Sequence, residues 1–407
     1  MIRIPALLFL TLTASAAIAA DWVGTWGASP LPPSEAAGPM PGTPAFSNQT
    51  VRQVVRISAG GEQLRLRLTN EYGDRPVEIG AARIALVADD GGLLPGSERE
   101  ITFAGDPGAV LPAGAPLLSD PVAVEVEDLA RVSISLYFPG DTGPCTCHAT
   151  GLETAFVSAP GDHTSGTFEP AETLQSRVFL SGVEVLSEAD GVVVAFGDSI
   201  TDGVGSSLGE NRRWPDLLAE RLAARRGGGF GVVNHGISGN RVLNDGAGDS
   251  ALARFDRDVL SVPGVTHVVV FEGINDIGFE FGRFEGPMAA FRAAMPTGVP
   301  VGAEALIAGY RQLIARAHSK GIEIYGATIA PYEGAAYYSE EGEAVRQAVN
   351  EWIRESGEFD AVLDFDAVLR DPQSPQRMAD GLHSGDFLHG SDAGYRAVAE
   401  SIDLTLF

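Results

Sequence analysis

The sequence predicts a two-domain protein, with an antiparallel β-sandwich over residues 21–188 and a doubly wound parallel α/β domain over residues 189–407. Two observations carry this prediction. Short segments that alternate polar and apolar residues dominate the first part of the chain. Continuous apolar segments separated by amphipathic helical segments dominate the second part. The length of 407 residues also exceeds what a single hydrophobic core usually organises.

The expected strands of the first domain are short and half-buried. Residues 63–68 and 122–127 alternate polar and apolar side chains, which is typical of strands with one face on a core. Residues 132–138 form a third candidate strand. Clusters of Pro, Gly, Asn and Asp separate these segments and indicate turns. Short strands joined by turns favour an antiparallel sandwich.

The second domain is expected to alternate strands with helices. Residues 192–196 are continuously apolar, as buried parallel strands are. A helix over residues 214–226 begins with Pro215 near its start and ends before a run of glycines. Further strands are expected at residues 232–233, 266–271, 322–329 and 361–365, and further helices at residues 303–320, 343–356 and 394–404. In such a domain the reactive groups lie beyond the carboxyl ends of the strands.

The first twenty residues have the features of a cleaved export signal. Arg3 precedes a short apolar run over residues 6–12, and small residues follow up to Ala19 and Ala20, the expected cleavage positions. The apolar run is short for a bilayer span, and no later stretch is long and apolar enough for one. We therefore expect a secreted or periplasmic protein without stable membrane insertion, a retained membrane anchor being the alternative.

The chain is strongly acidic. It contains 28 basic and 54 acidic residues, for a formal net charge of −26. A field of this sign disfavours binding to nucleic-acid phosphates and docking on anionic lipid. The sequence does not define an oligomeric state.

Cys145 and Cys147 are the only cysteines, and His148 follows them. Export makes a disulfide between them chemically possible, so we expect a local disulfide or inert thiols. A metal site is not expected, because the sequence offers no distant partner ligand for this short cluster.

Three expected strands end in residues with catalytic chemistry. Ser199 follows the first apolar strand in a Gly-Asp-Ser segment, where its hydroxyl can project into the crevice. Gly239 and Asn275 follow the next two strands. The backbone N–H groups of Ser199 and Gly239 and the side-chain amide of Asn275 can together form an oxyanion hole. Taken singly, each of these residues is also an ordinary turn or cap former.

Two Asp-x-x-His segments near the C-terminus can supply a base for Ser199. A neutral histidine must accept the serine proton, and a carboxylate must hold the histidine in the right tautomer. Asp386 with His389 and Asp380 with His383 have the same spacing, which brings both side chains to one side of a turn. Spacing alone does not distinguish the two pairs.

Together these motifs resemble the SGNH hydrolase superfamily, also called GDSL esterases and lipases. The serine, glycine, asparagine and histidine of that superfamily correspond to Ser199, Gly239, Asn275 and His389. The resemblance covers about residues 190–407 and implies a flavodoxin-like, doubly wound SGNH hydrolase domain.

The resemblance favours His389 as the base, because the family's histidine is typically followed by Gly-Tyr and a final helix, as at residues 394–395. Gly390 departs from the proline that commonly follows this histidine. The segment at residues 22–26 resembles the start of a subgroup with an N-terminal β domain. An α/β-hydrolase is disfavoured, because Thr201 occupies the position of the second glycine in Gly-x-Ser-x-Gly.

The resemblance implies an exported serine ester hydrolase that forms an acyl-enzyme on Ser199 and needs neither a metal nor an organic cofactor. Its substrate is expected to be a small-molecule, glycan or lipid ester, most simply a short-chain acyl or acetyl ester. The alternatives are a lipase or lysophospholipase, an acyltransferase with the same site, and a non-catalytic carbohydrate-binding protein. An acyl-binding lid is a further hypothesis for the Phe- and Met-bearing segment that contains Phe279, Phe281, Phe284, Met288, Phe291 and Met295. Simple packing of that segment is its alternative.

Overall fold

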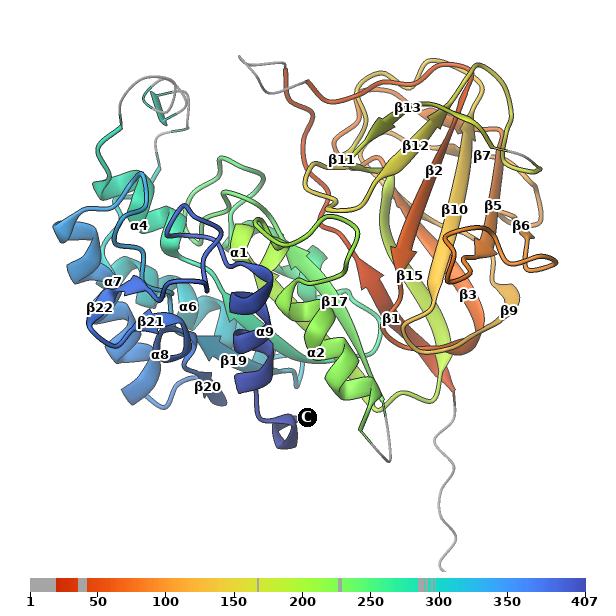
Figure 1. Cartoon of the computed structure of the whole chain (residues 1–407). Helices are drawn as coiled ribbons and strands as arrows, with labels where there is room; N and C mark the ends of the chain where they lie inside the picture. Colours follow the sequence, from red (N-terminus) through yellow and green to blue (C-terminus); the bar gives the residue numbers. More distant parts are fainter. Residues whose placement is uncertain are drawn as a thin grey trace, which may run out of the picture.

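Two parts lie side by side in the computed structural model, a β-rich part and an α/β part (Figure 1). The structure describes residues 20–35, 42–166, 168–225, 229–284, 289, 292–293, 296 and 298–407. The expected export signal lies outside the described residues except for its last residue, Ala20. The predicted fold class is confirmed for both parts. Whether the two parts fold as separate domains stays a prediction.

The β-rich part contains two antiparallel sheets. One has the order β1-β15-β3-β8, with β9 also paired to β3, and the other has the order β13-β12-β2-β10-β5-β6. The strands of the first sheet are β1 (Asp21–Gly27), β3 (Gly61–Thr69), β8 (Pro116–Leu118), β9 (Val122–Val126) and β15 (Leu180–Ser187). Those of the second are β2 (Gln49–Arg56), β5 (Ala81–Leu86), β6 (Arg99–Ile101), β10 (Arg131–Phe138), β12 (Ala155–Ser158) and β13 (Pro170–Leu174). Two short pairs complete this part, β4 (Val77–Ile79) with β7 (Ala109–Leu111) and β11 (Cys147–His148) with β14 (Arg177–Val178).

Side-chain alternation places these strands on a common core. In β9, Val122, Val124 and Val126 are buried, whereas the residues between them are exposed. Strand β3 likewise buries Leu64, Leu66 and Leu68. Because successive side chains of a strand point to opposite faces, the alternation in sequence becomes one apolar and one polar face.

The α/β part is built on a parallel sheet with the order β17-β16-β18-β19-β20. Its central strand β16 is buried along its whole length, which explains its continuous apolar sequence. After β16 the chain adds β17 on one side of this strand and then returns to add β18 on the other side. The topological switch point therefore lies at the end of β16. The strands are β16 (Gly191–Gly197), β17 (Phe230–Gly236), β18 (Val265–Phe271), β19 (Glu323–Ala327) and β20 (Ala361–Leu363).

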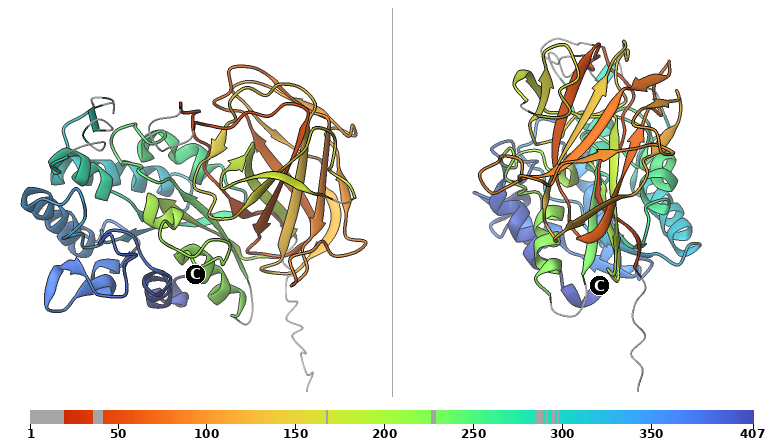
Figure 2. Two further views of the ribbon diagram at one scale, coloured as in Figure 1. Left: turned by 45° about the horizontal axis from the view of Figure 1, so that its top comes forward. Right: turned by 90° about the vertical axis from the view of Figure 1, so that its right-hand side faces the viewer.

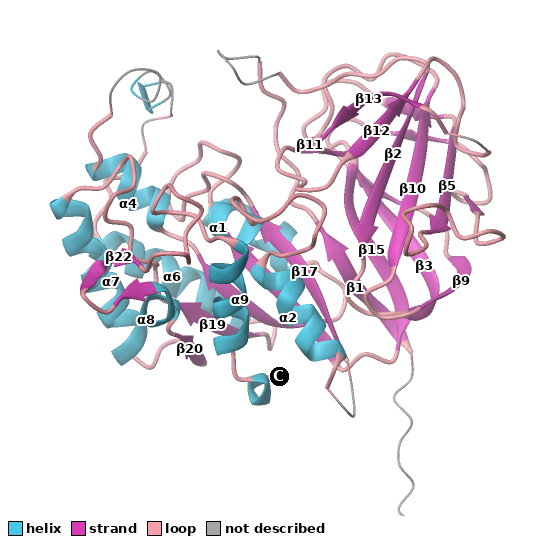
Figure 3. Cartoon of the chain, viewed as in Figure 1, coloured by secondary structure: helices cyan, strands magenta, loops and turns pink. Residues whose placement is uncertain are grey.

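Helices cover both faces of this sheet, and within the described residues the longer helices are confined to this part (Figure 3). Helices α2, α8 and α9 pack together on one face, and α3, α6 and α7 pack together on the other. The helices are α1 (Ser199–Asp202), α2 (Trp214–Ala223), α3 (Ala251–Phe255) with the π-helix η1 (Asp256–Leu260), α4 (Ile274–Phe281), α6 (Ala303–His318), α7 (Glu340–Glu355), α8 (Phe365–Leu369), α9 (Asp392–Ser401) and the 3-10 helix η2 (Leu404–Leu406). A hairpin of β21 (Arg370–Asp371) and β22 (Ser374–Met378) follows α8.

Capping explains where two helices differ from the sequence prediction. Helix α7 begins before residue 343, because the Ser339 hydroxyl accepts a hydrogen bond from the Gly342 N–H at 3.0 Å and caps the helix there. Ser391 caps α9 in the same way and starts that helix at Asp392. The sequence prediction placed these starts too late because it followed apolar spacing rather than caps.

The two parts meet where β1 crosses the edge strand β17 (Figure 2). The backbones approach closely at Gly231, where an added Cβ would lie 2.3 Å from the carbonyl oxygen of Gly24. Close by, the Val232 N–H donates to the Ser58 hydroxyl at 2.7 Å. The glycines thus permit direct backbone packing between the β-rich part and the edge of the parallel sheet.

Candidate active site

Ser199 lies at the carboxyl end of the central strand. Strand β16 ends at Gly197, and α1 begins at Ser199. Asp198 caps this short helix, because its carboxylate accepts a hydrogen bond from the Ile200 N–H at 2.9 Å. The strand and the cap therefore fix the serine at the switch point of the sheet, and only 5% of its surface is exposed.

The structure brings His389 and Asp386 to this serine. His389 Nε2 lies 2.8 Å from Ser199 Oγ, and His389 Nδ1 lies 2.5 Å from Asp386 Oδ2. A carboxylate beside Nδ1 requires the proton on that nitrogen, which leaves Nε2 as an acceptor for the serine O–H. This arrangement can withdraw a proton from the serine hydroxyl.

Asp386 is held in its charged form by the turn that carries it. Its Oδ1 accepts the backbone N–H groups of Leu388 and His389, both at 3.0 Å. Partial burial works against the charge, but the hydrogen bonds from the His389 ring and these backbone groups outweigh it and lower the pKa of Asp386. The turn also holds Phe387 at a φ of +59°, which is unusual for a residue with a side chain.

The second Asp-x-x-His segment is arranged differently. His383 Nδ1 accepts the Gly385 N–H at 3.0 Å, so this nitrogen is engaged within its own turn. His383 Nε2 lies 4.0 Å from Asp380, whose side chain is 89% exposed. The His383 ring packs on Phe387, with ring centroids 4.3 Å apart. Of the two candidate pairs, the structure brings Asp386 and His389 to Ser199.

A tight turn after β17 carries Gly239. The residue has a φ of +82°, a conformation that favours glycine. Asn240 fastens the loop that follows, since its amide donates to the carbonyls of Ala247 at 3.0 Å and Asp249 at 2.8 Å. Arg254 donates to the Asn240 side-chain oxygen at 2.8 Å. These contacts hold the turn in place independently of any substrate.

Asn275 offers a buried donor. Within the described residues its Nδ2 atom is buried and has no hydrogen-bond partner, although such groups are normally paired. Its side-chain oxygen accepts a hydrogen bond from the Tyr337 hydroxyl at 3.2 Å, which turns the amide nitrogen the other way. A free, oriented donor of this kind suits an oxyanion.

Carboxylates support the floor of the site. Asp276 accepts the N–H groups of Val242 at 2.7 Å and Leu243 at 3.0 Å, and so holds the chain beyond the Gly239 turn. Burial raises the pKa of Asp198 to about 7 and that of Asp276 to about 6. Burial and the nearby Asp198 also raise the pKa of Glu272 well above its usual range. Asp198 acts on the cap of α1 and Asp276 on the loop after Gly239, so neither is assigned a chemical step.

Three of the six Phe and Met residues of the proposed lid segment lie within the described residues. Phe279 is buried in α4, and its ring lies 5.9 Å from that of Phe284 and 5.8 Å from that of Tyr337. Phe281 and Phe284 are half-buried against the core. Met288, Phe291 and Met295 lie outside the described residues. Phe279 therefore packs on Tyr337, whose hydroxyl contacts Asn275, and the lid hypothesis stays a prediction.

The cysteines form a disulfide, Cys145–Cys147, with Cα atoms 5.4 Å apart. His148 next to it contacts Asp202 at 3.0 Å. Across the described ranges, no cluster of three or more His, Cys, Asp or Glu side chains is arranged to hold a metal ion. Nor does the described part of the chain contain a helix with the length and apolarity of a membrane span.

Sequence reasoning missed several residues that surround the site. Tyr337 and Arg254 carry no motif that marks their contacts, because each meets its partner only through the fold, whereas Asn240 directly follows Gly239 in the Gly-Ile-Ser-Gly-Asn segment. Asp202 is different, since it lies one turn after Ser199 on the same short helix. Helical spacing from the nucleophile could have drawn attention to it.

The fold and this edge of the sheet define an SGNH-like hydrolase. Residues 195–397 match the GDSL-like Lipase/Acylhydrolase family. Over this region the chain belongs to that family, which makes it a carboxylic ester hydrolase. No curated protein matches the sequence.

Several solved structures are similar to the α/β part. A lipase/acylhydrolase from Enterococcus faecalis is 19% identical, with 52% of this chain and 92% of that chain covered and a TM-score of 0.38. An acetylxylan esterase from Geobacillus stearothermophilus is 22% identical over 52% and 92% of the two chains, with a TM-score of 0.39. A GDSL-like lipase from Bacteroides thetaiotaomicron is 18% identical over 52% and 85%, with a TM-score of 0.37.

Proposed function

We propose that the protein is an exported serine esterase that hydrolyses short-chain acyl or acetyl esters through an acyl-enzyme on Ser199. The observation that carries the proposal is the continuous contact from Asp386 through His389 to the Ser199 hydroxyl. The matched family supplies the reaction class, ester hydrolysis.

In the first half of the reaction, His389 Nε2 takes the Ser199 proton while Ser199 Oγ bonds to the ester carbonyl carbon. The carbonyl oxygen becomes an oxyanion, which accepts hydrogen bonds from the Ser199 N–H, the Gly239 N–H and Asn275 Nδ2. The tetrahedral intermediate then expels the alcohol, which takes the proton from His389. An acyl group remains on Ser199.

In the second half, His389 takes a proton from water, and the hydroxide bonds to the acyl carbon. Collapse of the second tetrahedral intermediate breaks the Ser199–acyl bond, and the proton returns from His389 to Ser199 Oγ. Asp386 remains charged throughout and stabilises the imidazolium. The lowered pKa of Asp386 supports this role.

A small acyl group is favoured by the packing beside Asn275. Phe279 and Tyr337 are both buried and pack ring against ring. This side of the site is therefore filled by aromatic rings, which leaves less room for a long acyl chain.

Export is supported by the signal-like first twenty residues and by the disulfide Cys145–Cys147, since disulfides persist in oxidising compartments. Cell fractionation and the N-terminal mass of the purified protein test it. A mature chain that begins at Ala20 or Asp21 outside the cytoplasm is expected, and an intact N-terminus in the cytoplasm would contradict export.

The esterase proposal is tested with p-nitrophenyl acetate, butyrate and octanoate. We expect kcat/KM to fall from acetate to octanoate. Replacement of Phe281 and Phe284 by alanine in a folded protein should shift that preference if the segment forms an acyl-binding lid, and an unchanged preference would reject the lid. A wild type that is inactive on all three esters would contradict the proposal.

A further inference from the structure

A buried histidine of the β-rich part contacts the helix of the candidate nucleophile. His148 is 5% exposed and belongs to β11, far from the parallel sheet in sequence. Its Nε2 lies 3.0 Å from Asp202 Oδ1, at the opposite end of α1 from Ser199. The α/β part therefore meets a side chain of the β-rich part within one helical turn of the nucleophile.

Both ring nitrogens of His148 face acceptors. Nδ1 lies 2.9 Å from the carbonyl oxygen of Ser29, and Nε2 faces the Asp202 carboxylate. A carbonyl oxygen and a carboxylate both accept hydrogen bonds, so the imidazolium, with a proton on each nitrogen, is the form of the ring that satisfies both partners. Burial opposes that charge, but Asp202 and the Ser29 carbonyl outweigh it and raise the pKa of His148.

The other oxygen of Asp202 holds the turn that carries Gly239. Asp202 Oδ2 accepts the Ser238 N–H at 3.0 Å and the Ser238 O–H at 2.6 Å. Ser238 immediately precedes Gly239, and the Asn240 N–H closes the turn on the Ile237 carbonyl at 3.0 Å. Fixing Ser238 therefore fixes the peptide whose N–H belongs to Gly239.

A second residue of the β-rich part contacts the same turn. The Thr150 hydroxyl donates to Ser238 Oγ at 3.2 Å, while Ser238 donates its own proton to Asp202. The segment from Cys147 to Thr150 thus supports the turn directly through Thr150 and indirectly through His148 and Asp202. The directions of these hydrogen bonds are mutually consistent. Thr150 donates to Ser238, and both Ser238 and His148 donate to Asp202.

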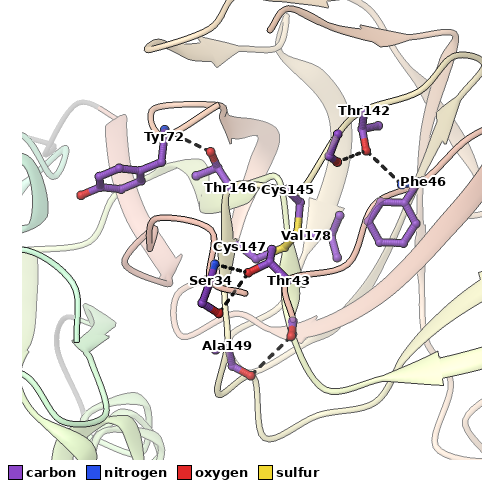
Figure 4. The surroundings of a disulfide bond; sticks show 12 residues. Ser34, Thr43, Phe46, Tyr72, Thr142, Cys145, Thr146, Cys147, Ala149 and Val178 are labelled. Atoms are coloured by element: carbon purple, nitrogen blue, oxygen red, sulfur yellow. Dashed lines mark hydrogen bonds between the residues drawn. A yellow bond between two sulfur atoms is a disulfide. The ribbon is translucent and has the colours of Figure 1, made fainter. Parts of the chain in front are cut away.

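Strand pairing and backbone hydrogen bonds hold this segment on the β-rich part, and the Cys145–Cys147 disulfide closes a short loop within it (Figure 4). Cys147 pairs with Val178 across β11 and β14, and its carbonyl accepts the Leu31 N–H at 2.9 Å. Thr146 Oγ1 accepts the Tyr72 N–H at 3.1 Å. His148 therefore projects from a segment whose position is fixed by other contacts. It can hold the Asp202 side chain in place, because its own position does not depend on Asp202.

We propose that His148 is a positioning residue for ester hydrolysis, which holds the Gly239 turn through Asp202 and Ser238, with Thr150 as a second support. This inference rests on the proposed function. It assigns a role to the β-rich part, which completes the oxyanion geometry of a site whose reacting groups all lie in the α/β part.

Two variants of His148 separate positioning from simple packing. His148→Gln places an amide N–H close to the position of Nε2 and can still donate to Asp202. His148→Asn places its amide near Nδ1 and can donate only to Ser29. The matched control is His318→Asn, because His318 also pairs with an aspartate, Asp360 at 2.9 Å, on the exposed side of α6.

We expect His148→Asn to lower kcat for p-nitrophenyl acetate by about 10-fold, less than the ~10²–10³-fold of removing an oxyanion donor outright, with KM changed by less than about threefold. The affinity for a boronic acid, which forms a tetrahedral adduct on the serine, should fall in parallel. His148→Gln should keep kcat within about threefold of wild type, and His318→Asn should not change it.

The outcomes distinguish the inference from the proposed function. An inactive wild type would overturn the proposed function and this inference with it. An active wild type with an unchanged kcat in folded His148→Asn, or with equal losses in the Asn and Gln variants, would overturn the inference alone. If His148→Asn does not fold, Asp202→Ala decides, because it removes the carboxylate that joins His148 to both the N–H and the O–H of Ser238. This variant should lower kcat at unchanged KM, and an unchanged kcat in the folded variant overturns the inference.

Discussion

The two ends of helix α1 each meet a histidine that is paired with an aspartate, yet the two pairs have different surroundings. At the start of the helix, Ser199 meets His389, and the side chains of His389 and Asp386 are 16% and 46% exposed. At its end, Asp202 meets His148, with 3% and 6% exposure. The first pair leaves Nε2 facing a hydroxyl and can move a proton. The second has both nitrogens bound to acceptors and can only hold a charge.

An Asp–His contact therefore does not by itself define a catalytic pair. The histidine can act as a general base when its second ring nitrogen faces a hydroxyl and the pair is partly open to water. It acts as a positioning residue when that nitrogen is bound to an acceptor and the pair is buried.

The largest effect is expected at the start of the helix. Ser199→Ala should lower kcat for p-nitrophenyl acetate by on the order of 10⁴- to 10⁶-fold, because no other group can form the acyl-enzyme. Steady-state kinetics measure the loss, and the unfolding midpoint should stay close to wild type. Substantial turnover by the pure, folded variant would contradict Ser199 as the nucleophile.

The two Asp-x-x-His segments provide a matched pair of variants. His389→Ala should reduce kcat by on the order of 10⁴-fold or more, because the serine loses its base. His383→Ala removes a similar ring from the same region but should change kcat by less than about tenfold, since its Nδ1 bonds within its own turn. The reverse order of the two losses would transfer the base to Asp380 and His383.

A smaller loss is expected at the oxyanion donors. Asn275→Ala should lower kcat by ~10²–10³-fold with little change in KM, because the amide acts on charge that develops only in the transition state. Tyr337→Phe removes the hydroxyl that orients this amide and should cost about tenfold. If Asn275→Ala raised KM and left kcat unchanged, the amide would bind ground-state substrate instead.

The remaining effects concern stability and its pH dependence at the interface between the two parts, not catalysis. Burial lowers the pKa of His235 to about 4, and its Nδ1 lies 3.1 Å from Ser29 Oγ. His235 binds a proton more readily in the unfolded chain than in the folded chain. The contribution of neutral His235 to the free energy of unfolding is therefore complete above pH ~6.5 and is lost as the pH falls towards 4, on the order of 3 kcal/mol in all. His148, whose pKa is raised, stabilises below pH ~6.5 and loses that contribution as the pH rises through its folded pKa.

Urea unfolding across pH measures both contributions. His235→Gln should flatten the decline in the free energy of unfolding on the acid side, and His148→Gln should flatten a decline on the alkaline side. Parallel curves for wild type and both variants would contradict the opposite charge states of the two histidines.

Much of the fold follows from local patterns in the sequence. The alternation that places Val122, Val124 and Val126 on one face is visible directly, and so is the apolar run of β16. Strand ends then locate Ser199, Gly239 and Asn275 without any tertiary information. The start of α7 was missed, because a serine cap and not apolar spacing sets it.

The contacts that join distant segments could not be predicted. Nothing near Tyr337 in sequence indicates that its hydroxyl meets Asn275, and nothing near His148 indicates Asp202. Such contacts depend on how the β-rich part and the loops pack on the parallel sheet. The choice between His389 and His383 likewise depends on the path of one turn, since both histidines have the same local spacing.

The assignment of Ser199, His389 and Asp386 is tested most directly by covalent labelling of the wild-type protein with a fluorophosphonate, followed by peptide mass spectrometry. We expect a single adduct on Ser199, formed at similar rates in wild type and His383→Ala and at least ~10²-fold more slowly in His389→Ala. An adduct on another residue, or a His389→Ala variant that is labelled as fast as wild type, would contradict the assignment of Ser199, His389 and Asp386.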